Sequence, residues 1–193
     1  MEYKLQTDNK EVQIIIRELV RVIDGNVTGD VVEFGCYSGG TSIHLAKTIS
    51  EFKQKKLFVY DSFEGLPEKT NSDTSTLGIQ FKPGELSVSK KQFIKNIQKA
   101  NVPIPIIKKA WFSELTDGDI PENICFAYLD GDYYQSIKDS LKLIESNMAD
   151  KSTIVVDDYY NESLPGVRKA VDEWLAGKTI KLKIENSLAI LYL

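Results

Sequence analysis

Two carboxylates stand side by side directly after an apolar run near the end of the sequence. The run from Thr153 to Val156 has four apolar or β-branched residues without polar alternation, and Asp157 and Asp158 follow it. Such a run is typical of a strand that is covered on both faces in a parallel sheet. Adjacent carboxylates near a buried edge repel each other, so they persist only with a counter-charge or a bound proton. We therefore expect a positive group beside them.

A second group of carboxylates follows the apolar run CFAYL. Asp130 comes directly after this run, and Gly131 and Asp132 come next. A doubly wound sheet places Asp130 beside the pair Asp157 and Asp158, because the two strands that carry them are neighbours. Three carboxylates at one sheet edge form an oxygen-rich site for a hard divalent cation such as Mg²⁺. The sequence thus predicts a metal site at Asp130, Asp157 and Asp158, and helix capping is the alternative for Asp132 and Asp158 individually.

A glycine-rich turn in VVEFGCYSGGTS offers a second candidate site. Gly35, Gly39 and Gly40 let the backbone approach a small ligand closely, although a tight turn between strand and helix also uses glycine. Their spacing is not the G-x-G-x-x-G of dinucleotide-binding proteins, so an NAD-dependent oxidoreductase is the weaker alternative. Glu33 can accept from an ammonium group, and Asp61 can accept from both hydroxyls of a ribose or cap a turn. Together they suit a ligand that joins an amino acid to a nucleoside.

Six motifs resemble those of class I S-adenosylmethionine-dependent methyltransferases and, among these, the macrocin O-methyltransferase family. They are VEFGCYSGGTS, YDSFEGLP, WFSEL, LDGDYY, VVDDY and PGVRKAVDEW, and they extend from about Val31 to Trp174. The resemblance implies an O-methyltransferase that moves a methyl group from S-adenosylmethionine to a sugar hydroxyl of a natural product or surface glycan. It also implies a divalent cation at the three aspartates of the predicted metal site.

The resemblance assigns residues to the cofactor. It implies that Glu33 contacts the methionine amine, that Asp61 contacts the ribose, and that the WFSEL motif lines the adenine pocket. The motif residues expected at the cofactor are Glu33, Gly35, Cys36, Tyr37, Gly39, Thr41, Ser42, Asp61, Ser62, Phe63, Trp111, Phe112, Ser113 and Asp130.

The expected chemistry needs alignment and a proton acceptor. A sulfonium methyl group is already activated, and alignment of donor and acceptor can lower the barrier by roughly 7–11 kcal/mol. A metal that holds two neighbouring hydroxyls would fix this geometry and lower the acceptor's pKa, so vicinal diols are the expected acceptors. Related catechol-type enzymes, which act on aromatic or other small hydroxylated substrates and are the alternative function, place a lysine where this chain has Tyr133. We therefore expect Asp130, Asp132 or Tyr133 to act as the general base.

Alternating strand and helix patterns must position these residues. Strand patterns lie at 30–35, 56–61, 103–109, 124–130 and 152–158, and helical patterns lie at 12–23, 39–52, 87–100, 134–147 and 165–176. The segment 178–193 has two β-rich runs that meet at 185–187, which indicates an antiparallel hairpin. The sequence thus predicts an α/β fold: a doubly wound, mostly parallel, seven-stranded Rossmann-like sheet with a C-terminal antiparallel hairpin.

Length and composition indicate one domain, residues 1–193, with an N-terminal helix and short lid in 1–30 and a lid loop at 64–86. The net charge of −4 and the scattered lysines argue against nucleic acid as a partner. No apolar run reaches the roughly 20 residues that span a bilayer, and no signal sequence is visible, so a cytoplasmic protein is expected. Cys36 and Cys125 are expected to be buried free thiols. The expected partner is a small sugar-containing acceptor, and a homodimer or larger homo-oligomer stays open.

Overall fold

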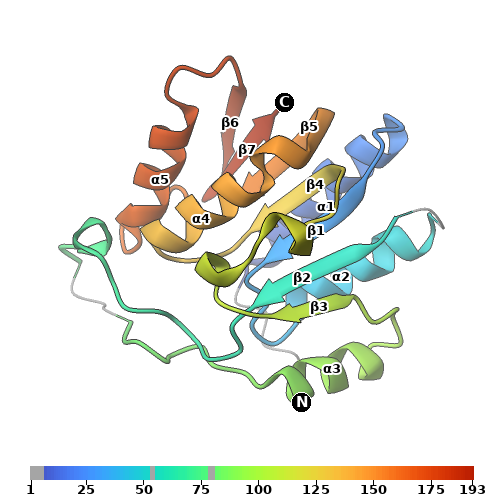
Figure 1. Ribbon diagram of the computed structural model, residues 1–193, viewed down its shortest axis with the longest axis horizontal. Helices are drawn as coiled ribbons and strands as arrows, with labels where there is room; N and C mark the ends of the chain where they lie inside the picture. The colour runs from blue at the N-terminus through green and yellow to red at the C-terminus, as the bar shows by residue number, and fades with distance from the viewer. Residues whose placement is uncertain (1–6, 53–54, 78–80) are drawn as a thin grey trace.

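The computed structural model describes residues 7–52, 55–77 and 81–193, and these form one sheet of seven strands with helices on both faces (Figure 1). The strand order is β3-β2-β1-β4-β5-β7-β6. The pairs β3–β2, β2–β1, β1–β4 and β4–β5 are parallel, whereas β7 is antiparallel to both β5 and β6. The predicted fold, including the C-terminal hairpin, is therefore confirmed. The strands are β1 Asp30–Phe34, β2 Leu57–Asp61, β3 Ile106–Lys109, β4 Ile124–Leu129, β5 Met148–Val156, β6 Lys181–Glu185 and β7 Leu188–Tyr192.

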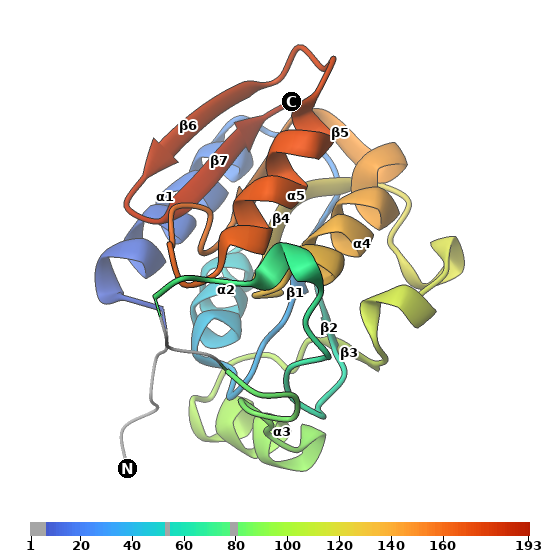
Figure 2. The ribbon, with the colours of Figure 1, turned by 90° about the vertical axis from the view of Figure 1, so that its left-hand side faces the viewer.

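The sheet lies between two layers of helices (Figure 2), and a separate hydrophobic core fills the space on each face of the sheet. Alternate strand residues face opposite layers, so Val31 packs toward the first core and Val32 toward the second. The first core contains α1 Asn9–Asp24, α2 Gly40–Ser50 and α3 Lys90–Lys99, and the second contains α4 Tyr134–Ile144 and α5 Pro165–Leu175. Short 3₁₀ turns complete the elements: η1 Asn71–Asp73, η2 Phe112–Glu114, η3 Asp117–Asp119 and η4 Glu145–Asn147.

The strand register brings the predicted site residues to the same edge of the sheet. Phe34 pairs with Tyr60 on one side and with Leu129 on the other, and Leu129 pairs with Val156. The residues that follow these four therefore leave the carboxyl edge of the sheet together, at the point where the strand order reverses between β1 and β4. They are Gly35, Asp61, Asp130 and Asp157.

The predicted lid loop, 64–86, crosses this edge of the sheet. The two arms of the loop pair with each other, because the N–H of Leu66 donates to the carbonyl of Glu85 at 2.8 Å and the N–H of Gly84 donates to the carbonyl of Leu66 at 2.9 Å. Residues 78–80 of this loop, and residues 1–6 of the predicted N-terminal segment, lie outside the described residues. In the described part of the chain, no helix has both the length and the apolar character needed to cross a membrane.

Candidate active site

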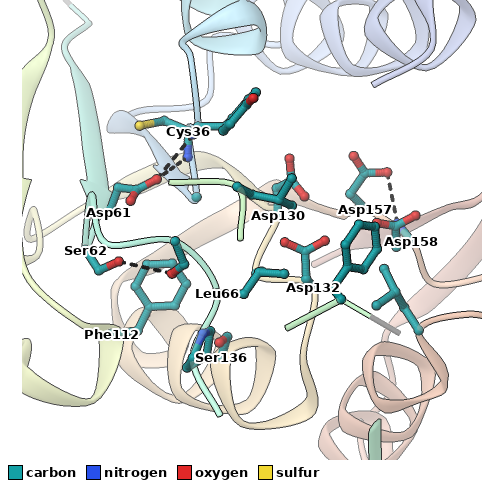
Figure 3. A pocket seen from close by; sticks show the side chains of 18 of the residues that line it. Cys36, Asp61, Ser62, Leu66, Phe112, Asp130, Asp132, Ser136, Asp157 and Asp158 are labelled. Atoms are coloured by element: carbon teal, nitrogen blue, oxygen red, sulfur yellow. Dashed lines mark hydrogen bonds between the residues drawn. The ribbon is translucent and has the colours of Figure 1, made fainter. Parts of the chain in front are cut away.

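A cavity of about 240 Å³ lies at the carboxyl edge of the sheet, where β1, β2, β4 and β5 end. Figure 3 shows Cys36 and Asp61 at one end of this cavity, and Asp157 and Asp158 at the opposite end. Asp130 lies between the two groups, so a ligand that fills the cavity contacts both.

Four aspartates, Asp130, Asp132, Asp157 and Asp158, extend from the middle of the cavity to the end opposite Asp61 and form the aspartate group. One carboxylate oxygen from each of Asp130, Asp132 and Asp158 lies within 4.8 Å of the other two. Asp157 lies beside this group and is buried. The hydroxyl of Tyr128 donates to its Oδ2 at 2.5 Å, and the N–H of Asp158 donates to its Oδ1 at 2.9 Å.

The four carboxylates repel one another when all of them are ionised. Burial raises the pKa of Asp130 well above its usual value, and the charges of Asp157 and Asp132 raise it further. Burial also raises the pKa of Asp132 and of Asp157, in both cases with a contribution from Asp158. None of the ion pairs among the described residues involves these four side chains. The group can be neutralised by protons or by a cation.

The donor set fits a hard divalent cation. Carboxylate oxygens are the ligands that Mg²⁺ and Ca²⁺ prefer, and the oxygens of Asp130, Asp132 and Asp158 are close enough together to share one ion. The predicted ligands were Asp130, Asp157 and Asp158. The structure brings Asp132 into the group of three and places Asp157 next to it, hydrogen bonded to Tyr128.

The glycine-rich turn and Asp61 form the other end of the cavity. The carboxylate of Asp61 accepts from the N–H groups of Cys36 at 2.8 Å, Tyr37 at 3.3 Å and Phe63 at 2.6 Å. A carboxylate offers about four acceptor sites, so Asp61 retains capacity for a ligand hydroxyl. Gly35 is required where it stands, because its φ is +85° and a Cβ there would lie 1.9 Å from the carbonyl oxygen of Asp130.

Several residues at this cavity or next to it have left-handed backbone conformations. Tyr37, Phe63, Asp132 and Asp158 all have positive φ values, between 43° and 59°. Aspartate tolerates this conformation, but for a tyrosine or phenylalanine it is a rare and strained one. Such strain accumulates at functional sites, where the surrounding structure holds it in place.

Comparison with known proteins identifies the family to which the chain belongs. Residues 8–188 match the model of the family described as Macrocin-O-methyltransferase (TylF). The chain belongs to the macrocin O-methyltransferase family. This match confirms the resemblance that the sequence motifs indicate.

Relatives of this macrocin O-methyltransferase family member come from Streptomyces. The chain is 26% identical over 161 residues to the 8-demethyl-8-(2,3-dimethoxy-alpha-L-rhamnosyl)-tetracenomycin-C 4'-O-methyltransferase of Streptomyces olivaceus, which covers 79% of this chain and 60% of the relative. It is 27% identical over 169 residues to the demethyldecarbamoylnovobiocin O-methyltransferase of Streptomyces niveus, which covers 83% of this chain and 64% of the relative. The chain thus spans less than two thirds of the length of both relatives.

The fold of the chain is similar to that of the O-methyltransferase NovP. The TM-score is 0.83 at 24% identity, and the match covers 95% of this chain and 79% of NovP. This likeness supports the class I methyltransferase fold and concerns the fold alone.

The predicted cofactor residues of this family member, all of which are described, fall into two groups. Those that line the cavity are Gly35, Cys36, Tyr37, Asp61, Ser62, Trp111, Phe112 and Asp130. Those that do not line it are Glu33, Gly39, Thr41, Ser42, Phe63 and Ser113. The roles assigned to both groups stay predictions. Cys36 and Cys125 are buried free cysteines, as expected.

Glu33 is fully buried behind the glycine-rich turn. Its Oε2 accepts from the hydroxyl of Ser42 at 2.5 Å, whereas its Oε1 has no hydrogen-bond partner among the described residues. Burial raises the pKa of Glu33 to about 8, and the charge of Asp61 acts in the same direction. The unpartnered oxygen fits an ammonium donor, but Glu33 does not line the cavity, so its contact with the methionine amine stays a prediction.

The three candidate bases differ in position. Asp130 and Asp132 line the cavity, whereas Tyr133 is buried outside it, with its hydroxyl 3.5 Å from the carbonyl of Phe81. This position favours the aspartates over Tyr133 as groups that reach a substrate proton.

Residues from outside the six motifs also line the cavity, among them Thr7 and Glu11. Glu11 accepts from the N–H of Ser187 at 3.3 Å and from its hydroxyl, and it forms a capping box with Asp8 at the start of α1. The spacing D-x-x-E is a helix-start signal. It does not reveal that α1 directs this glutamate toward the aspartates, because that depends on how α1 packs on the sheet.

Proposed function

We propose that the chain is an S-adenosylmethionine-dependent O-methyltransferase that uses a divalent cation, Mg²⁺ foremost, and methylates a sugar hydroxyl of a vicinal diol. The observation that carries this proposal is the shared cavity: Asp61 and the glycine-rich turn line one end, and the aspartate group lines the other. Family membership supports the methyl-transfer chemistry, and the rhamnosyl group in the name of one relative supports a sugar acceptor.

The cofactor would be held by the turn after β1 and by Asp61. Asp61 is pinned by three backbone N–H groups, so its carboxylate is oriented before any ribose arrives. Phe112 packs edge-to-face on Phe34, with ring centroids 5.2 Å apart, which fixes an aromatic wall for an adenine ring. When bound, S-adenosylmethionine supplies an electrophilic methyl group on sulfur.

The cation would be held by Asp130, Asp132 and Asp158, with Asp157 as the alternative ligand from the sequence prediction. When bound, the cation supplies positive charge that orients acceptor oxygens and lowers the pKa of an attached hydroxyl. Asp130 and Asp132 are also placed to receive the hydroxyl proton, because both line the cavity in which the acceptor would bind. One or both hydroxyls of a vicinal diol would bind to the cation, and the two neighbouring carboxylates could accept the proton from either. The site therefore suits an acceptor with two adjacent hydroxyls.

The proposal also includes the predictions from the sequence: residues 1–193 form one methyltransferase domain that acts in the cytoplasm on a small-molecule acceptor, and a homodimer or larger homo-oligomer stays open. A catechol-type acceptor would use the same pair of oxygens, so the acceptor class needs a direct test.

That test is transfer of a labelled methyl group from S-adenosylmethionine to matched acceptors. A 6-deoxyhexose glycoside with free vicinal hydroxyls is compared with the same glycoside methylated at one of them and with catechol, each with Mg²⁺ or with a chelator. Transfer to the diol glycoside that stops with chelator is the expected result. Transfer to catechol alone would support the aromatic acceptor, transfer that survives chelation would contradict the metal role, and NADH binding without S-adenosylmethionine binding would support an oxidoreductase.

A further inference from the structure

Asp73 lies in the loop 64–86 but is buried, with only 1% of the residue's surface exposed. Its Oδ2 accepts from the N–H of Thr70 at 2.8 Å and from the hydroxyl of Thr70 at 2.7 Å. Its Oδ1 accepts from the N–H of Tyr134 at 2.7 Å. Tyr134 is the first residue of α4 and comes two residues after Asp132. The loop is therefore tied to the segment that carries one of the site aspartates.

Asp73 takes the place of a local helix cap. The N-cap residue of α4, Tyr133, makes no side-chain capping hydrogen bond. The first N–H groups of a helix have no partner within the helix, and a carboxylate there also interacts favourably with the helix dipole. Asp73 supplies this carboxylate from a position 61 residues earlier in the chain.

Helix α5 closes over the bond between Asp73 and Tyr134. A Cβ at Gly166, the second residue of α5, would lie 2.0 Å from Asp73 Oδ1 and 2.9 Å from the backbone nitrogen of Tyr134. A glycine is thus needed where α5 meets this bond. The side chain of Lys169 from the same helix donates to the hydroxyl of Ser72 at 2.9 Å. The middle of the loop is therefore held by α4 and α5 together.

Both arms of the loop line the candidate active site, through Leu66 and Pro67 before η1 and through Leu86 after it. We propose that Asp73 is a positioning residue of this site: its carboxylate fixes the turn that carries Asp132 and holds the described parts of the loop, 64–77 and 81–86, against the cavity. The inference rests on the proposed function, because that function gives Asp132 its role at the cation.

The test compares Asp73→Ala, Gly166→Ala and the double variant with wild type. The matched control is Asp119→Ala, because Asp119 forms the same capping box with Thr116, through bonds of 3.0 Å to its N–H and hydroxyl, without capping α4. The readouts are hydrogen exchange of residues 133–137 and 64–77, and Mn²⁺ affinity measured by electron paramagnetic resonance of the free ion.

Asp73→Ala is expected to speed exchange of the first turn of α4 about tenfold, which corresponds to the loss of a helix N-cap. It is also expected to speed exchange of 64–77 and to weaken Mn²⁺ binding by about tenfold, because the turn before α4 loosens. Gly166→Ala should reproduce these changes, since its Cβ displaces the Asp73 carboxylate. The double variant should lose less than the sum of the two single variants, because removal of the carboxylate relieves the 2.0 Å contact, whereas the 2.9 Å contact with the backbone nitrogen of Tyr134 remains. Asp119→Ala should leave all three readouts at wild-type values.

Wild-type exchange in α4 and wild-type Mn²⁺ affinity in folded Asp73→Ala would overturn the proposal, even if its melting temperature falls. Additive effects in the double variant would overturn it as well. If Asp73→Ala does not fold, Asp73→Asn serves instead, because its one acceptor oxygen should give intermediate values for all three readouts. A wild-type protein that binds no Mn²⁺ would contradict the proposed function, and the exchange of α4 and of the loop would still decide the role of Asp73.

Discussion

The hydroxyl of Tyr128 lies 2.5 Å from Oδ2 of Asp157 and 3.3 Å from Oδ2 of Asp130, beneath the aspartate group. Tyr128 is fully buried in β4, and Asp157 follows β5. A phenol has one proton to donate, so the shorter contact identifies Asp157 as its main partner. This contact holds the ends of two neighbouring strands together where the cation is proposed to bind.

Tyr128→Phe is expected to lower the free energy of unfolding by about 1–3 kcal/mol, because Oδ2 of Asp157 would lose its main donor while the side chain stays buried. Urea unfolding in the presence of a chelator measures this change. Tyr133→Phe is the control, since among the described residues its hydroxyl contacts only the carbonyl of Phe81, at 3.5 Å, and its loss should cost less than about 1 kcal/mol. Equal losses in the two variants would contradict the special role of the Tyr128 hydroxyl.

Glu33 is expected to make stability depend on pH. Its pKa is about 8 in the folded chain because of burial, whereas an unfolded glutamate ionises near about pH 4.3. Unfolding therefore releases a proton between these values, and the free energy of unfolding falls as pH rises. Glu33→Gln cannot ionise, so its stability should fall less steeply, by up to about 1.4 kcal/mol per pH unit between roughly pH 5 and 7. Parallel slopes in urea unfolding of the two proteins with chelator would contradict this account.

Two single substitutions can show whether Asp132 or Asp157 binds the cation. The group of three oxygens predicts that Asp132→Asn weakens Mn²⁺ binding by about tenfold or more, because a charged ligand is lost. Asp157→Asn should have the smaller effect, since Asp157 is already engaged by Tyr128. Calorimetric titration of both variants with Mn²⁺ measures the difference. The reverse order would restore the ligand set predicted from the sequence, with Asp157 in place of Asp132.

Gly35→Ala is expected to be far more damaging than Gly84→Ala. Both glycines have positive φ, +85° and +80°, so alanine strains the backbone at each by about 1–2 kcal/mol. At Gly35 the new Cβ would also meet the carbonyl of Asp130, whereas at Gly84 no atom of the described residues lies within 4 Å of it. Thermal unfolding and S-adenosylhomocysteine affinity should both fall much further for Gly35→Ala. Similar losses at the two sites would show that close approach to Asp130 is unimportant.

Much of the framework follows from local patterns. The apolar runs before Asp61, Asp130 and Asp157 predict strands, and parallel strands end at a common edge, so the meeting of these residues was predictable. The exact membership of the aspartate group was not. Asp132 joins it through a turn with φ of 59°, and a side-chain direction set by such a turn is not encoded in hydrophobic periodicity.

Residues that reach the site through tertiary packing were also beyond sequence patterns. Asp73 lies in a stretch without periodicity, and its partner Tyr134 is 61 residues away. Glu11 is recognisable as a helix-start residue, but its position at the cavity depends on how α1 lies across the sheet. Contacts of this kind need the folded arrangement before they can be seen.

Anomalous diffraction from crystals grown with Mn²⁺ and S-adenosylhomocysteine tests the central claim most directly. The account predicts one manganese peak within about 2.3 Å of oxygens from Asp130, Asp132 and Asp158. It also predicts the thioether sulfur in the same cavity, with the ribose hydroxyls on Asp61. A manganese peak elsewhere, or a cofactor bound outside this cavity, would contradict it.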